Sequence, residues 1–209
     1  MNEPLLKTQT DIAVAPIPWR EALPVISTAR MTLREVGVSD ALSLYAMITP
    51  EEVQRFISPP PATLPGFEQF LGWAQGQRAN GAYVCFAVVP HGSEGAVGLF
   101  QVRQLDPAFR IAEWGFAIGS PYWGTGLFIA CARLIVDFVF DTIGAIRLEA
   151  RAAVQNARGN GALRKLGAVQ EGTLRKSFCR DGQRHDQVLW SIIDQDWRQA
   201  RAAWAPRIH

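Results

Sequence analysis

The segment SPYWGTGLF, Ser120 to Phe128, decides how this chain folds. It follows an apolar run, combines a proline and two large aromatic residues with two glycines one residue apart, and leads into a long apolar segment. Glycines at such a junction indicate a sharp turn of the backbone or the close approach of another molecule. We therefore expect a buried strand to end just before Ser120 and a helix, Thr125–Asp141, to begin at the glycines.

The same turn is a candidate anion site. Backbone N–H groups in the first turn of a helix are unpaired and lie at the positive end of the helix dipole. Such groups bind phosphate or pyrophosphate, and glycine lets the anion reach the backbone. The groups concerned are those of Gly124, Thr125, Gly126 and Leu127. From these residues alone, a tight turn without a ligand is an equal alternative.

Two common nucleotide motifs do not fit the turn. The nucleotide P-loop requires a lysine after its second glycine, and Leu127 stands there. The dinucleotide fingerprint requires a third glycine, and Ile129 takes its place. The spacing therefore points to another kind of phosphate ligand, if there is one.

Outward from the turn, apolar periodicity predicts an alternation of strands and helices. A first strand and three helical segments precede a meander of three strands, and a strand, a helix and two more strands follow the glycine-turn helix. The expected strands are Ala29–Val36, Ala82–Val89, Ala96–Gln101, Ile111–Ile118, Ile146–Ala152, Ala168–Lys176 and Gln187–Ile193. Asp181-Gly182 marks a hairpin turn between the last two. We expect one α+β domain over residues 28–209, with a mixed, mostly antiparallel sheet of about seven strands flanked by helices, after an N-terminal arm over residues 1–27.

Composition excludes several classes of protein. The chain has 209 residues, 48% hydrophobic, and a net charge of +2 without a basic stripe, which argues against a nucleic-acid binder. No signal peptide is recognisable, and the most apolar segment, 127–140, is interrupted by Arg133 and Asp137, so we expect no membrane span. The dispersed Cys85, Cys131 and Cys179 predict no metal site and favour a reducing cytoplasm.

Three motifs between Ala112 and Gly172 resemble a known family. They are Glu113-Trp114-Gly115, then Tyr122-Trp123-Gly124-Thr125-Gly126, then Asn156 followed by Lys165-Leu166-Gly167-Ala168 and Glu171-Gly172. In order and spacing they resemble the GNAT acyltransferase superfamily, and within it the RimJ/RimL-type N-acetyltransferases. The likeness extends more weakly over residues 28–195.

The resemblance implies a site for acetyl-CoA. Backbone amides of the glycine turn would hold the pyrophosphate. The strand before the turn would splay from its neighbour, so that freed backbone groups pair with the pantetheine arm. The cofactor-binding residues implied are Phe116, Ala117, Ile118, Trp123, Gly124, Thr125, Gly126, Leu127 and Asn156. Asn156 also has the position of a helix cap, which alone would explain it.

The chain departs from the family pattern at four places. Pro121 and Ala130 replace residues that are often polar or charged, and Ala168 replaces a phenylalanine. Gly159 stands where relatives often carry a serine assigned a role near the thioester sulfur. The usual acid for the leaving thiolate is therefore missing or is supplied from elsewhere.

Acetyl transfer to an amine needs a group that accepts the ammonium proton. Glu113, in an apolar strand shortly before the freed backbone groups, is the first candidate; pairing with Arg103 or Arg110 is its structural alternative. Glu149 on the neighbouring strand is the second candidate, and with Arg147 and Arg151 it could equally form an ion-pair row.

The acceptor is less well specified. Trp114, Trp123, Phe56 and Tyr83 could line its pocket, although each could equally be a core residue. The loop Ser58–Gly66 carries no carboxylate, which favours a protein or peptide N-terminus over a polyamine or an antibiotic. A small-molecule amine such as an amino acid and a non-catalytic CoA-binding module stay as alternatives, and a homodimer stays open.

Overall fold

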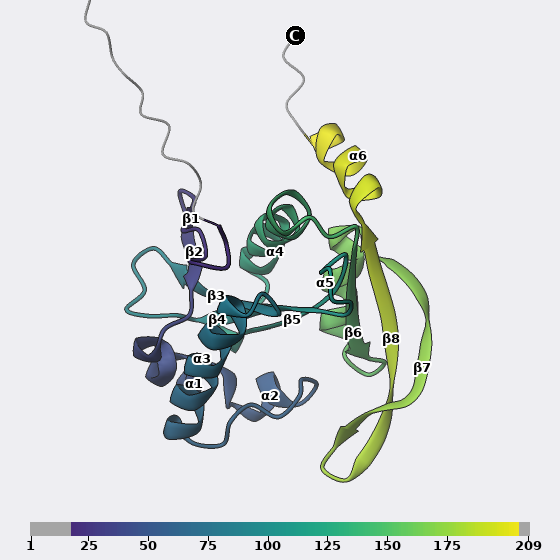
Figure 1. The fold of residues 1–209 in the computed structure, drawn as a ribbon. Coiled ribbons are helices and arrows are strands. Elements are labelled where there is room, and N and C mark those ends of the chain that lie inside the picture. The colour runs from purple at the N-terminus through teal and green to yellow at the C-terminus, as the bar shows by residue number, and fades with distance from the viewer. Residues whose placement is uncertain (1–17, 205–209) are drawn as a thin grey trace, which may run out of the picture.

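The computed structural model describes residues 18–204, and these form one eight-stranded sheet flanked by helices (Figure 1). The strand order is β1-β2-β3-β4-β5-β6-β8-β7. The strands are β1 Ile26–Ser27, β2 Met31–Glu35, β3 Tyr83–Pro90, β4 Gly98–Gln104, β5 Ile111–Ile118, β6 Arg147–Ala153, β7 Val169–Arg180 and β8 Gln183–Ile193. All seven expected strands are present, and the predicted mostly antiparallel α+β sheet is confirmed. The additional strand, β1, has two residues, too few for an alternating pattern to reveal it.

The pair β5 and β6 is the one parallel pair within this described sheet, and it is short. Ile111, Ala112 and Glu113 stand opposite Arg147, Leu148 and Glu149, and pairing ends there although both strands continue. The connection between them contains α4 Leu127–Asp137, as a parallel crossover requires. Beyond Glu113 and Glu149 the two strands therefore diverge and open the sheet at its centre.

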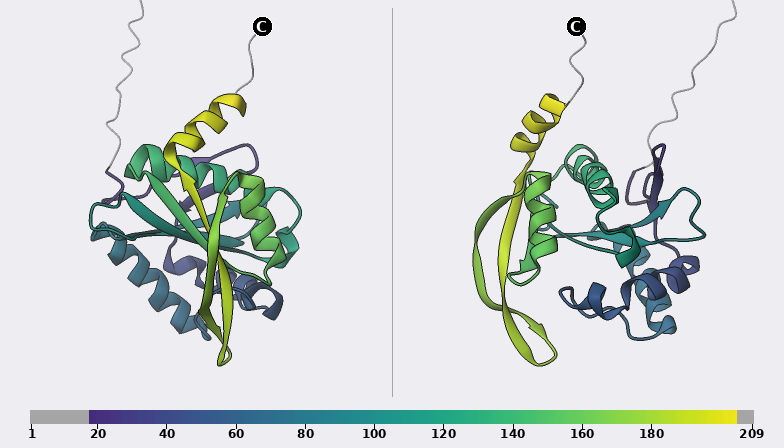
Figure 2. Two further views of the ribbon diagram at one scale, coloured as in Figure 1. Left: turned by 90° about the vertical axis from the view of Figure 1, so that its right-hand side faces the viewer. Right: turned by 180° about the vertical axis from the view of Figure 1, so that it is seen from behind.

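Helices cover both faces of the sheet (Figure 2). On one side, α4 and α5 Ala157–Leu166 pack on a core that includes Phe86, Phe100 and Trp190. On the other, α1 Ala41–Ile48 and α3 Leu64–Ala79 pack on a smaller core that includes Leu44 and Leu71. The short α2 Glu51–Gln54 lies between these two helices in the chain, and α6 Asp194–Trp204 follows β8.

Two helix boundaries differ from those predicted. The expected loop Ser58–Gly66 ends earlier, because the Thr63 hydroxyl accepts a hydrogen bond from the Gly66 N–H at 3.2 Å and caps α3 at Leu64. The helix expected over Thr125–Asp141 runs as α4 to Asp137 and continues as a π-helical segment, Phe138–Ile143, that ends at Gly144 with φ +87°.

The last two strands form a long hairpin that projects beyond the sheet (Figure 1). Its turn is Asp181-Gly182, as predicted, with φ of +49° and +74°. The register shifts between Leu174 and Phe178, where Lys176 has φ +51°. Near the tip, the Arg180 guanidinium donates to the Gln54 side chain of α2 at 3.2 Å. The end of the hairpin therefore contacts α2.

Part of the predicted N-terminal arm joins the domain. Trp19 and Leu23 are buried in the larger core, and β1 pairs with β2. Residues 1–17 lie outside the described residues. None of the helices within residues 18–204 has the length and apolarity needed to cross a bilayer.

Candidate active site

The divergence of β5 and β6 leaves backbone groups facing a gap. The Ile111 carbonyl accepts from Leu105, and the Gly119 N–H donates to Val97, so odd-numbered residues of β5 direct their backbone groups toward β4. Trp114, Phe116 and Ile118 therefore direct theirs toward β6, where strand pairing has ended. The Ile118 carbonyl is engaged by the Trp123 indole N–H at 2.8 Å.

Alternation separates the three strand residues assigned to pantetheine. The N–H and C=O of Phe116 face the gap, and those of Ala117 lie on the β4 side. On the opposite wall of the gap, the Val154 N–H donates to the carbonyl of Asp186 in β8, so even-numbered residues of β6 direct their backbone groups toward β8. The odd-numbered Arg151 therefore directs its N–H and C=O toward β5. An extended chain with amide groups could pair with Phe116 and Arg151 at once.

The glycine turn lies at the open end of this gap. Gly124 and Gly126 have φ of +75° and +83°, which a residue with a side chain adopts only with strain. A Cβ on either glycine would meet no atom within 4 Å, so both project into open space. The Leu127 N–H contacts the Thr125 hydroxyl at 3.3 Å, and the first helical bond of α4 runs from the Ala130 N–H to the Gly126 carbonyl at 3.2 Å. The Leu127 N–H, one of the predicted anion-binding groups, is thus engaged within the turn. Within the described residues no hydrogen bond is made by the N–H groups of Gly124, Thr125 and Gly126, which are available to an anion.

Asn156 caps α5 beside the same gap. Its side-chain oxygen accepts from the Gly159 N–H at 2.9 Å, as the capping interpretation expected. A Cβ on Gly159 would lie 2.5 Å from the Asn156 amide nitrogen. A serine at Gly159 would therefore require the Asn156 side chain to shift. Arg158 of the same turn stacks over the Trp123 ring at 3.4 Å from its centre and joins α5 to the glycine turn.

A pocket of about 720 Å³ opens from the gap toward α1, α2 and α3. Its walls come from the diverging ends of β5 and β6, the start of α5, the segment 56–61 after α2, and the hairpin residues Ser177, Phe178 and Gln187. Of the four aromatic residues proposed for the acceptor side, Phe56, Tyr83 and Trp114 line this pocket. Trp123 instead packs at the glycine turn under Arg158.

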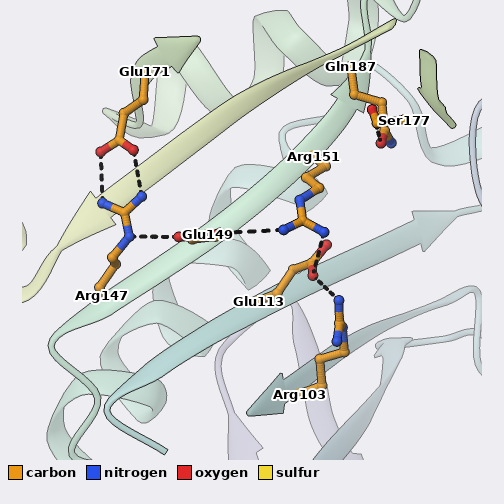
Figure 3. A network of polar contacts seen from close by, with 8 residues as sticks. All are labelled: Arg103, Glu113, Arg147, Glu149, Arg151, Glu171, Ser177 and Gln187. Carbon is orange, nitrogen blue, oxygen red and sulfur yellow. Dashed lines mark hydrogen bonds and ion pairs between the residues drawn. The ribbon is translucent and has the colours of Figure 1, made fainter. Parts of the chain in front are cut away.

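Charged side chains cross the sheet in a row on this pocket face (Figure 3). The register places Arg103 opposite Glu113 and Glu113 opposite Glu149, and the row continues to Ser191 on β8. Glu113 accepts a hydrogen bond from Arg103 through Oε2, which also lies 3.5 Å from Arg151. Within the described residues no hydrogen bond reaches its Oε1. The predicted pairing alternative with Arg103 is thus present, whereas Arg110 donates to the Gly144 carbonyl at 2.9 Å.

The far end of the row is fully paired. Arg147 donates to Glu149 at 2.8 Å and binds Glu171 with two bonds of 2.8 and 2.5 Å. Hydrogen bonds from Arg147 and from Ser191 lower the pKa of Glu171 to about 2. Glu149 does not line the pocket, and its contacts match the ion-pair row that the sequence left open.

Other ionisable groups near the site are held in one state. Tyr83 donates to the Gln101 side chain, and burial raises its pKa, so the phenol keeps its proton. Burial raises the pKa of the Cys131 thiol to about 12 and that of Cys85 as well, so both behave as core residues. Within residues 18–204, no group of three His, Cys, Asp or Glu side chains is arranged to hold a metal ion.

Sequence reasoning missed the hairpin wall of the pocket. Ser177 and Gln187, joined by a hydrogen bond of 3.0 Å, line the pocket because the register shift in β7 turns this part of the strand. No sequence signal marked that shift.

Comparison with known proteins gives a consistent result. A family model described as "Acetyltransferase (GNAT) domain" matches residues 30–169. The chain is 25% identical over 175 residues to the "Uncharacterized N-acetyltransferase YoaA" of Bacillus subtilis (strain 168), a match that covers 81% of this chain and 97% of that protein.

Two further relatives match about half of their own length. The ribosomal protein uS5-alanine N-acetyltransferase of Escherichia coli (strain K12) is 28% identical over 94 residues, 45% of this chain and 48% of the relative. The spermidine N(1)-acetyltransferase of the same strain is 27% identical over 100 residues, 48% of this chain and 54% of the relative. Among solved structures, the ribosomal-protein-S5-alanine acetyltransferase from Vibrio fischeri superposes with a TM-score of 0.73. The match covers 83% of this chain and 98% of that protein at 20% sequence identity, and it shows that the two share a fold.

Proposed function

The chain belongs to the GNAT acetyltransferase family, and we propose that it transfers acetyl from acetyl-CoA to the α-amine of a peptide or protein N-terminus. The observation that carries the proposal is the gap between β5 and β6, which joins an open glycine turn at one end to a pocket that contains Glu113 at the other.

The described residues fit acetyl-CoA. The turn at Gly124 and Gly126 supplies outward backbone N–H groups for the pyrophosphate, and the gap supplies backbone groups of Phe116 and Arg151 for the amides of pantetheine. Asn156 stands at the gap with its side chain committed to the α5 cap. This arrangement directs the thioester toward the pocket lined by Glu113.

Glu113 is the proposed proton acceptor. It lines the pocket and is the last residue of β5 paired with β6, so its carboxylate lies where the strands separate. Its Oε1 is available to take the ammonium proton, directly or through a water molecule. Arg103 holds the other oxygen and fixes the carboxylate in place. Glu149 is outside the pocket and is assigned to the ion-pair row.

The acceptor assignment has two supports. One relative acts, by its name, on an alanine of ribosomal protein uS5. The pocket is also unsuited to a polyamine, because Glu113, the single carboxylate among its lining residues, is already bound by Arg103. A polyamine, the acceptor that the name of the spermidine acetyltransferase relative gives for that protein, would find no second carboxylate in this pocket for its further charges.

A peptide panel tests the proposal. Purified protein is incubated with acetyl-CoA and short peptides with free or blocked N-termini, and CoA release and peptide mass are followed. We expect a mass gain of one acetyl group on free N-termini alone. Acetylation of spermidine in preference to every peptide would overturn the assignment of the acceptor.

A variant separates an enzyme from a CoA-binding module. Glu113→Gln should lower kcat by about a hundredfold or more while the Kd for CoA, measured by calorimetry, stays within a factor of about two. An unchanged rate would refute the role of Glu113 and leave the fold assignment intact.

The location of the protein in a reducing cytoplasm and its assembly as a homodimer stay predictions.

A further inference from the structure

The pocket contains an arginine whose hydrogen-bonding capacity is unused. Arg151 lines the pocket, and its side chain is 34% exposed. Its two carboxylate contacts are 3.5 Å to Glu113 and 3.8 Å to Glu149, both longer than an N–H···O hydrogen bond. Arg147, four residues earlier on the same strand face, makes three bonds of 2.8 Å or less. The Arg151 guanidinium, with five N–H donors in a planar fork, can therefore accept a further anionic partner.

The charge of the pocket also favours an anion. Its lining residues include two guanidinium groups, Arg103 and Arg151, and one carboxylate, Glu113. That carboxylate accepts its hydrogen bond from Arg103. The next carboxylate along the row, Glu149, is hydrogen-bonded to Arg147 at 2.8 Å and lies outside the pocket. The pocket thus carries an excess positive charge that centres on Arg151.

We propose that this pocket selects an acceptor with a carboxylate close to its reactive amine, and that Arg151 binds this carboxylate. The inference rests on the proposed acetyl transfer and names its substrate class. A guanidinium binds a carboxylate with two parallel charge-assisted bonds, which fix orientation as well as position. A dication or polyamine would instead place its second charge beside two guanidinium groups.

The geometry limits where the carboxylate sits in the acceptor. Arg151 lies 3.5 Å from the Glu113 oxygen, so an amine at Glu113 and a carboxylate at Arg151 must be separated by only a few bonds. The α-carboxylate of a free amino acid meets this condition, and so does an Asp or Glu side chain at the start of a peptide. Ser177 and Gln187 line the pocket with neutral polar groups and leave this charge preference unchanged (Figure 3).

Matched acceptors test the preference. Two amidated pentapeptides, Ser-Asp-Ala-Ala-Tyr and Ser-Asn-Ala-Ala-Tyr, differ by one carboxylate. Free serine and serinamide form a second pair, and spermidine is the cationic probe. Binding is measured by calorimetry on protein saturated with CoA, which permits no turnover, and kcat/KM is measured separately by CoA release with acetyl-CoA.

We expect the acidic member of one pair to bind about tenfold or more tightly than its neutral partner, since a hydrogen bond to a charged group is worth about that factor. Arg151→Gln should reduce the acidic-to-neutral ratio to near one, and Arg151→Lys should retain part of it because the positive charge remains. Arg110→Gln is the control, since Arg110 lies outside the pocket and donates to the Gly144 carbonyl rather than to the charged row, and it should leave the ratio unchanged.

The arms separate the outcomes. A preference in the peptide pair supports the inference and assigns the carboxylate to a side chain; a preference in the serine pair supports it and assigns the carboxylate to a free amino acid. The inference is overturned by equal binding within both pairs, by tighter binding of spermidine, or by an equal fall of the ratio in Arg110→Gln. Acidic binding without turnover supports the carboxylate site and refutes the proposed acetyl transfer.

Discussion

An alanine at Gly126 should weaken CoA binding far more than it weakens the fold. Gly126 precedes α4 with φ +83° and ψ −5°, and a Cβ there would meet no protein atom within 4 Å. The fold therefore loses only the preference of alanine against left-handed backbone, about 1–2 kcal/mol. For a chain of this size, that corresponds to a fall in Tm of about 2–4 °C for each kcal/mol.

The effect on the ligand is larger because the open space is the proposed site of the pyrophosphate. A methyl group would hold the anion away from the outward N–H groups at the start of α4. Loss of one charge-assisted hydrogen bond costs about 1.5–3 kcal/mol, which raises the Kd for CoA about tenfold to a hundredfold. Isothermal titration with CoA measures this Kd, and a thermal scan of the free protein measures Tm.

Gly144 provides a matched control. It ends the π-helical segment with φ +87° and ψ +23°, and a Cβ there also meets nothing within 4 Å. Gly144→Ala should lower Tm by a similar amount and leave the Kd for CoA unchanged. If Gly126→Ala lowers Tm as expected but binds CoA like the unmodified protein, the glycine turn is only a tight turn and the pyrophosphate binds elsewhere.

Three further predictions concern stability. Asn160→Leu should lower the free energy of unfolding by about 3 kcal/mol in urea titrations. The buried Asn160 amide donates to the Ala153 and Asn156 carbonyls at 2.9 Å and accepts from the Trp190 indole N–H at 2.8 Å. A loss below about 1 kcal/mol would contradict this network. Gly98→Ala should lower the free energy of unfolding by about 1–3 kcal/mol, because the new Cβ would lie 2.5 Å from the Ala117 carbonyl oxygen. Gly72→Ala in α3, where a Cβ meets nothing within 4 Å, should instead raise it by up to about 1 kcal/mol. A change of the same sign in both variants would be inconsistent with the close β4–β5 contact at Gly98. The pKa of Glu171 is lowered from 4.5 to about 2, so its ionised form contributes stability that is complete above pH 4.5 and is lost as pH falls toward 2. Glu171→Gln should therefore lower the urea midpoint at pH 7 but not at pH 2, and only modestly because the side chain is 35% exposed. Equal shifts at both pH values would exclude this linkage.

The order of elements could be predicted because it depends on local chemistry. Glycines at 124 and 126 adopt the left-handed backbone expected of them, Asp181-Gly182 forms the hairpin turn, and Asn156 caps α5. Each of these signals is carried by a few neighbouring residues whose backbone preferences do not depend on the rest of the fold. The splayed strand was predicted only through the family resemblance.

The boundaries of the site could not be predicted, because they depend on which strands become neighbours. Alternation places Glu113 and Glu149 on one face of their strands, but only the register of β5 on β6 places them opposite each other and ends the pairing there. The same holds for Ser177, which lines the pocket because the β7–β8 register shifts between Leu174 and Phe178.

Arg151 illustrates how register converts a structural residue into a candidate binding residue. In sequence, Arg147 and Arg151 are equivalent members of one alternating row, and an ion-pair role explains both. In the fold, Arg147 lies where β5 and β6 are paired and has two carboxylates at hydrogen-bond distance, Glu149 and Glu171. Arg151 lies four residues further along β6, beyond the end of the pairing with β5, and both of its carboxylate contacts are too long for hydrogen bonds. The divergence that opens a path for pantetheine thus also leaves one guanidinium incompletely paired beside the acceptor. If the acceptor carries a carboxylate there, a single feature of the sheet determines both the cofactor path and the substrate preference.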